Sequence, residues 1–308
     1  MKQEFENNIE IIKTPVFSLH KFGDSENGTP IFIVPPFAGR SGNIAQNLID
    51  KCVSHDQPVY AYELHSATQS TKNTSISDLV DILHTCQKEI GGPVELIGLC
   101  QGGWLSALFA AKHPESVIRF TSFATPFNTK TGTDNCIEKY MRNPDVITYQ
   151  KIIVAMNDGI QPGMLQWLAF SLVDPIEIYI SRWLKLWECI WDENEVNIKK
   201  WIKNNSWYDS PQNLAGNWFL DCLEHHFDKN ELYEGKWIVG DDVVGLSNIK
   251  CPCVCFAGED DEITGIDQVF GLKDKVTGPI ECILLPGAGH TKAFVGTNEL
   301  NIFEEKFF

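Results

Sequence analysis

Short apolar runs alternate with helical patterns along the first third of the chain. The runs have the length of buried β-strands, and they cover residues 31–34, 59–63, 94–97 and 117–123. Between two of these runs, one face of a predicted helix over residues 75–84 carries Ile76, Leu79, Val80 and Leu83. Buried strands separated by helices predict a mostly parallel sheet that helices cover on both faces.

The same pattern returns near the C-terminus, where residues 252–256 and 281–285 read as two further buried strands. The stretch between, residues 128–247, is helical in pattern and holds most of the tryptophans. Trp183, Trp187 and Trp191 recur every four residues there. Two compatible interpretations follow: these indoles form the buried face of a helix, or they line an apolar channel for a substrate.

The charge balance argues against a nucleic-acid partner. The net charge is −16, and we find no basic stripe that would attract a phosphate backbone locally. The N-terminus lacks the apolar core of a signal peptide, and no apolar run of about 18 residues occurs. We therefore expect a cytoplasmic protein that does not insert into a membrane.

The ten cysteines then read as reduced thiols rather than as a disulfide framework. The tightest cluster is Cys251, Cys253 and Cys255, which alternate along a predicted strand. Metal sites usually use loop spacings such as C-x₂-C, so we interpret these thiols as small buried apolar groups. We expect neither a metal site nor a cofactor.

The strongest chemical signal is a strand, a tight turn and a helix around Gly98-Leu-Cys100-Gln-Gly102. This is the form of the G-x-S-x-G nucleophile elbow of α/β-hydrolases, with cysteine in the serine position. Side chains at the glycines would clash with the neighbouring strand and helix. The turn also places the sulfur at a helix N-terminus, which favours the thiolate. The alternative is a glycine-rich turn that holds a core cysteine.

The order of residues along the chain strengthens the first interpretation, because α/β-hydrolases place their acid and histidine after late strands. Asp261 follows the strand at 252–256, and His290 follows the strand at 281–285. We expect Asp261 to orient the imidazole and His290 to take the thiol proton. Glu259 and Asp260 are adjacent candidates for the acid. The fold predicted is thus an α/β-hydrolase core over residues 1–127 and 248–308, with an inserted helical lid over 128–247.

Backbone N–H groups for an oxyanion are predicted at two places. Gln101 follows the nucleophile, and Phe37 is the first residue after Pro35-Pro36 that has an N–H. Arg40, in the same loop, is a candidate for binding an anionic group of the substrate. The alternative is a solvated surface arginine. Trp104, just after the elbow, is a second candidate substrate-binding residue.

With these pieces placed, the chain resembles polyhydroxyalkanoate synthases and the related intracellular depolymerase-like hydrolases. The resemblance runs from about residue 30 to 296. Besides the proline pair, it rests on Gly98-Leu-Cys-Gln-Gly-Gly103, Ser206-Trp-Tyr-Asp209, Asn230-Glu-Leu-Tyr-Glu-Gly235, Val243-Val-Gly-Leu-Ser-Asn-Ile249, Gly258-Glu-Asp-Asp-Glu-Ile263 and Gly289-His290. The family's aspartate stands two residues before the isoleucine, which selects Asp261. Thr264-Gly265 departs from the family, which usually has a proline nearby.

The resemblance implies that a 3-hydroxyacyl group, delivered as an ester or a coenzyme A-type thioester, acylates Cys100. Hydrolysis and acyl transfer both stay open, because water exclusion by the lid decides between them. The alternative is a catalytically silent binding or granule-associated protein that keeps the fold. The sequence does not determine the oligomeric state, and a homodimer is compatible with it.

Overall fold

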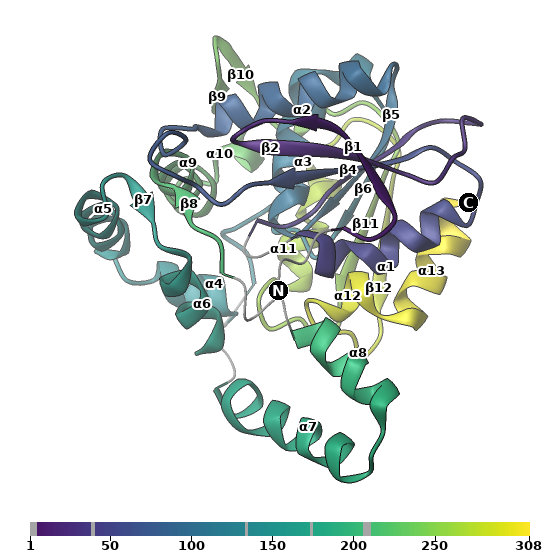
Figure 1. Cartoon of the computed structure of the whole chain (residues 1–308). Helices are drawn as coiled ribbons and strands as arrows, with labels where there is room; N and C mark the ends of the chain where they lie inside the picture. The colour runs from purple at the N-terminus through teal and green to yellow at the C-terminus, as the bar shows by residue number, and fades with distance from the viewer. Residues whose placement is uncertain (1–4, 38–40, 133–134, 173–174, 206–210) are drawn as a thin grey trace.

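The computed structural model describes residues 5–37, 41–132, 135–172, 175–205 and 211–308. Among these residues the main element is an eight-stranded sheet in the order β1-β2-β4-β3-β5-β6-β11-β12 (Figure 1). All neighbouring strands from β4 to β12 run parallel. The strands are β1 (Asn8–Lys13), β2 (Phe17–Phe22), β3 (Ile31–Val34), β4 (Val59–Leu64), β5 (Val94–Leu99), β6 (Val117–Phe123), β11 (Cys253–Gly258) and β12 (Ile280–Leu285). The predicted parallel sheet is therefore confirmed.

Helices cover both faces of the sheet. On one face the helices are α2 (Ile76–Ile90), α3 (Gln101–Lys112) and α11 (Ile266–Phe270). On the other face they are α1 (Ser41–Val53), α12 (Lys292–Val295) and α13 (Thr297–Phe307). The stripe predicted for residues 75–84 is buried in α2, whose start is fixed by a capping box between Ser75 and Asp78.

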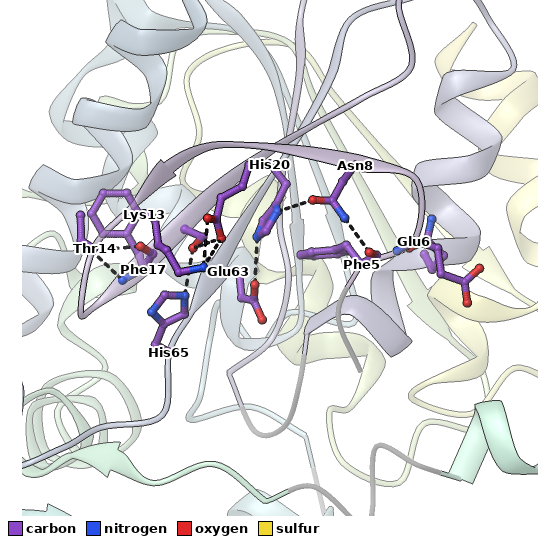
Figure 2. Close-up of polar contacts among 12 residues, drawn as sticks. Phe5, Glu6, Asn8, Lys13, Thr14, Phe17, His20, Glu63 and His65 are labelled. Carbon is purple, nitrogen blue, oxygen red and sulfur yellow. Dashed lines mark hydrogen bonds and ion pairs between the residues drawn. The ribbon is translucent and has the colours of Figure 1, made fainter. Parts of the chain in front are cut away.

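The hairpin of β1 and β2 adds an antiparallel edge that the apolar pattern did not predict. Its buried residues are both apolar and polar: Phe17, Leu19 and Phe22 join the core, and the buried His20 lies between Asn8 and Glu63 (Figure 2). His20 Nδ1 is 2.7 Å from Asn8 Oδ1, and its Nε2 is 2.9 Å from Glu63 Oε2. A strand that carries buried polar residues of this kind does not show the alternation of apolar and polar positions by which strands are recognised in a sequence.

The chain between β6 and β11 is mostly helical and crosses the edge of the sheet where the parallel strands end (Figure 1). It also contains two small two-stranded sheets, β7 with β8 and β9 with β10. Its elements are α4 (Cys136–Met141), α5 (Val146–Met156), β7 (Ile160–Gln161), α6 (Gly163–Ser171), a π-helical turn (Glu177–Ser181), α7 (Arg182–Trp191), α8 (Glu195–Asn205), β8 (Leu214–Ala215), α9 (Gly216–Asp221), a second π-helical turn (Cys222–Asp228), α10 (Glu231–Glu234), β9 (Trp237–Val239) and β10 (Asp242–Val244). Its role as a lid stays a prediction.

The tryptophan repeat is not the buried face of a helix, and that interpretation was wrong. In α7 the exposed fraction is 42% for Trp183, 64% for Trp187 and 87% for Trp191. Figure 1 shows why, since α7 extends beyond the body of the protein, whereas α8 returns to it and contacts the covering helix α1. Trp183 does pack on Trp201 of α8, with ring centroids 5.3 Å apart. The rest of the stripe faces outward because the body of the protein does not reach it.

Of the helices in the described ranges, none combines the length and the apolar character needed to cross a lipid bilayer.

Candidate active site

Cys100 occupies the turn between β5 and α3. Its backbone has φ 49° and ψ −113°, a left-handed conformation that a residue with a side chain rarely adopts. Cys100 is also the N-cap of α3, so the N–H groups of the first helical turn point toward its position. The side chain is partly exposed, and its thiol is free. The strained elbow predicted from the sequence is therefore present.

Glycines make this elbow sterically possible. A Cβ on Gly98 would lie 2.5 Å from the Cα of Gly103, and one on Gly102 would lie 2.1 Å from the carbonyl oxygen of Val34. A Cβ on Gly103 would lie 1.8 Å from Thr125 Oγ1. All three distances are below any normal contact, so α3 packs this closely on β5, on the end of β3 and on the loop after β6 only because these positions have no side chain.

Asp261 and His290 come together from the loops that follow β11 and β12. Because these two strands are parallel neighbours, their carboxyl ends lie at the same edge of the sheet. His290 Nδ1 is 2.8 Å from Asp261 Oδ2 and 3.0 Å from Oδ1. The side chain of His290 is 10% exposed and that of Asp261 is 1% exposed. The imidazole therefore donates to a carboxylate that is almost entirely shielded from water.

Thr264 completes the carboxylate's environment, and the sequence analysis did not assign it a role. Its Oγ1 donates to Asp261 Oδ2 at 2.7 Å, and the N–H groups of Ile263 and Thr264 donate to Oδ1 at 2.9 and 2.8 Å. An aspartate followed by a threonine three residues later is typical of a local side-chain turn, and that spacing was the available signal.

The electrostatics of the three groups are coupled. Burial lowers the pKa of His290, but the nearby Cys100 and Asp261 outweigh burial and raise it well above its usual value by charge and hydrogen bonding. Burial likewise opposes ionisation of Asp261, but His290 and Thr264 hold the pKa of that carboxyl below its usual value. The thiol, the imidazole and the carboxylate thus form one interacting group that favours a charged histidine.

The adjacent candidates for the acid lie elsewhere. Glu259 is exposed and accepts a hydrogen bond from the N–H of Gly287 at 3.0 Å. Asp260 is also exposed, and its own N–H donates to the carbonyl of Ala288. Of these three carboxylates, the described contacts bring Asp261 to His290.

Two histidines of the segment between β6 and β11, His225 and His226, have partners other than the Cys100 site. His225 Nδ1 lies 2.8 Å from Glu231. His226 is fully buried, and its ring stacks on Trp104 with centroids 4.9 Å apart. Burial lowers the pKa of His226 to about 3.

The two predicted oxyanion donors lie close together, but one of them is engaged. The N–H of Phe37 donates to the side-chain oxygen of Gln101 at 3.0 Å. The Gln101 side-chain oxygen thus lies where a substrate oxygen would accept from the Phe37 N–H. A substrate oxygen that uses the Phe37 N–H must therefore first displace the Gln101 side chain.

Arg40 and Trp104 are the two residues predicted to bind substrate, and the structure describes one of them. Arg40 lies outside the described residues. Trp104 is fully buried and stacks on His226 and Trp237 behind the elbow, so it packs within the core in this structure. Its contact with a substrate stays a prediction.

Within the described part of the chain, no three histidine, cysteine, aspartate or glutamate side chains are placed so that they could hold one metal ion. In that part, Cys253 and Cys255 are buried in β11, whereas Cys251 precedes the strand and is half-buried.

Comparison with solved structures identifies the fold. Rv0554 from Mycobacterium tuberculosis superimposes with a TM-score of 0.63 at 15% identity, covering 95% of this chain and 93% of that one. A monoacylglycerol lipase from Paleococcus ferrophilus gives a TM-score of 0.61 at 15% identity, covering 94% and 96%. The sheet order, the strained elbow and these matches make the chain an α/β-hydrolase-fold protein.

Sequence comparison is more specific. No protein-family model matches the chain. The poly(3-hydroxyalkanoate) polymerase subunit PhaC of Allochromatium vinosum is 27% identical over 203 residues, 66% of this chain and 55% of the relative. The PhaC subunit of Thiocystis violacea is 27% identical over 181 residues, 58% of this chain and 48% of the relative. The chain is thus a distant homologue of PhaC subunits, and it spans about half the length of these relatives.

Proposed function

We propose that the chain catalyses acyl-enzyme chemistry on 3-hydroxyacyl esters or thioesters, with Cys100 as the nucleophile. The observation that carries the proposal is the contact of His290 with Asp261 at 2.8 Å, beside a thiol held in a strained elbow at a helix N-terminus. The coupled pKa shift of His290 supports the same arrangement, because its largest favourable cause is Cys100.

The sequence of proton transfers follows from this geometry. Nδ1 of His290 donates to Asp261, which leaves Nε2 for the thiol. Transfer of the thiol proton to Nε2 gives a thiolate, and the sulfur attacks the acyl carbonyl carbon. The imidazolium then gives its proton to the departing alcohol or thiol. Water or a hydroxyl acceptor next loses a proton to Nε2 and attacks the thioester, which releases the Cys100 thiol.

The oxyanion of each tetrahedral intermediate would accept from the N–H of Gln101 and, after the Gln101 side chain moves, from that of Phe37. In a serine protease, loss of one such donor raises the activation free energy by about 2.7–4 kcal/mol. The engaged Phe37 N–H is also the observation that favours the alternative, a catalytically silent binding protein, because an immovable Gln101 side chain would keep this donor from a substrate.

The substrate class is supported by homology, since the relatives are named poly(3-hydroxyalkanoate) polymerase subunits. The proposal covers both hydrolysis and transfer. Water that reaches the thioester yields free acid, whereas a hydroxyl group of a second 3-hydroxyacyl unit yields a longer chain.

The test is incubation of the full chain with 3-hydroxybutyryl-coenzyme A and, separately, with a short hydroxybutyrate oligomer. We expect intact mass spectrometry to show an acyl adduct on Cys100, and product analysis to show free acid or longer oligomer. Cys100→Ala is expected to lose turnover while its circular dichroism spectrum stays unchanged. Cys189→Ala, which alters a cysteine of α7 away from the elbow, is the matched control and keeps full activity. Substantial turnover in Cys100→Ala would assign the nucleophile elsewhere, and absence of adduct and turnover in the unaltered chain would favour the silent protein.

A further inference from the structure

Two cysteines face each other across the last two strands of the sheet. Cys255 of β11 and Cys282 of β12 are direct partners in the parallel register. Their sulfur atoms are 3.3 Å apart, with the Cys255 thiol donating to the Cys282 sulfur. The pair lies outside the proposed active site and is not used by the proposed chemistry.

The two thiols differ in access to solvent. Cys255 is fully buried, whereas Cys282 is partly exposed on β12, which is the edge strand. A small dissolved reagent therefore reaches Cys282 first. The Cys255 hydrogen bond lowers the pKa of Cys282 against the effect of burial, and Lys273 lowers it further. Donation of that same hydrogen bond, together with burial, raises the pKa of Cys255.

The backbone geometry is compatible with a covalent link. Neighbouring strands lie about 4.8 Å apart, which is within the range of Cα separations of about 4.4–6.8 Å that disulfides span. The sulfur atoms need to approach by roughly 1.2 Å to reach the disulfide bond length of about 2.05 Å. Among the described residues β12 is the last strand of the sheet and pairs with β11, so no second strand there opposes this adjustment.

We propose that Cys255 and Cys282 form a redox modification site that a hydroperoxide converts to a disulfide. The Cys282 thiolate attacks the peroxide oxygen, the O–O bond breaks, and a sulfenic acid and hydroxide result. The Cys255 thiol then attacks the sulfenic sulfur and releases water. The two thiols together lose two hydrogen atoms, and hydrogen peroxide is reduced to two molecules of water.

Other thiols provide the comparison. Cys251 and Cys253 also interact, with the Cys253 thiol donating to the Cys251 carbonyl at 3.3 Å. They are two residues apart on one segment, where same-face side chains in extended chain lie about 7 Å apart, so a link between them requires a local bend. The facing pair on two strands needs no such change.

The test uses the full chain, hydrogen peroxide at a few equivalents, and N-ethylmaleimide to trap the remaining thiols. Trypsin cleavage at lysine leaves residues 251–273 on one peptide and residues 276–292 on another. We expect these two peptides to be joined in the non-reduced digest and separated by dithiothreitol. Fragmentation of the joined peptide is expected to place the link at Cys255.

Matched variants make the assignment specific. Cys282→Ser and Cys255→Ala are expected to abolish the joined peptide, whereas Cys251→Ser is expected to form it fully. The Cys100→Ala protein is expected to form the same link, so this result does not depend on the proposed catalytic activity. A link through Cys251 or Cys253, or Cys282 recovered as sulfinic acid beside an unmodified Cys255, would overturn the proposal.

Discussion

Thr264 is the residue whose replacement tests the reasoning about the acid–histidine pair most directly. It is 1% exposed, and its hydroxyl donates to Asp261 Oδ2 at 2.7 Å. The same hydroxyl lies 3.4 Å from His290 Nδ1. Thr264→Val keeps the shape of the side chain and removes the donor, while Thr264→Ser keeps the donor. Thr264 is thus a positioning residue that acts through Asp261.

The expected magnitude comes from the hydrogen bonds of the carboxylate. Asp261 retains the two backbone donors and His290 after the substitution, and it loses one hydrogen bond to a charged group, which contributes about 1.5–3 kcal/mol. We expect the free energy of unfolding at pH 7 to fall by about this amount. If half of it reaches the transition state, kcat/KM falls roughly three- to tenfold.

The pH dependence separates this role from simple packing. The pKa of Asp261 lies below its usual value in the folded state, so the stabilisation is present above the usual carboxyl pKa of about 4 and is lost as the pH falls through the folded value. Urea unfolding is expected to show a larger difference in stability between the native protein and Thr264→Val at pH 7 than at pH 3. A difference that is equal at both pH values, or a Thr264→Ser variant as impaired as Thr264→Val, would refute the reasoning.

Three further outcomes follow from the structure. Gln101→Ala frees the N–H of Phe37 and is expected to raise kcat/KM for the 3-hydroxybutyryl thioester about two- to tenfold, since a neutral hydrogen bond contributes about 0.5–1.5 kcal/mol. An unchanged kcat/KM would mean that the Gln101 side chain does not compete with the substrate for this N–H. Burial lowers the pKa of His226 to about 3, so stability is lost as the pH falls from about 6.5, by up to about 1.4 kcal/mol per pH unit. His226→Phe is expected to flatten that loss in urea unfolding between pH 7.5 and 4.5, and parallel curves would contradict it. Gly102→Ala places a Cβ 2.1 Å from the Val34 carbonyl oxygen and is expected to lower the free energy of unfolding by about 3 kcal/mol or more, measured as a lower melting temperature. An unchanged melting temperature would show that β3 and α3 have room to separate.

Much of the candidate site could be predicted because it depends on local signals. The glycines around Cys100 mark a strand–turn–helix junction, and the loops after two late strands predict the meeting of Asp261 and His290. The Gln101 contact with Phe37 was not predictable, since it joins side-chain and backbone atoms 64 residues apart. Its existence depends on where two loops end in space.

The amino-acid sequence alone determined the parallel strands, the buried face of α2 and the elbow, because hydrophobic period and backbone sterics act over a few neighbouring residues. Tertiary structure alone decided three other features. The tryptophans of α7 are exposed because their helix projects beyond the body, although their spacing is that of a buried stripe. At the β1–β2 edge, the buried His20 has polar partners on two neighbouring strands, Asn8 of β1 and Glu63 of β4, and Glu63 is 43 residues away in the sequence. Cys255 meets Cys282 because strand register, which no local pattern reports, sets them opposite each other.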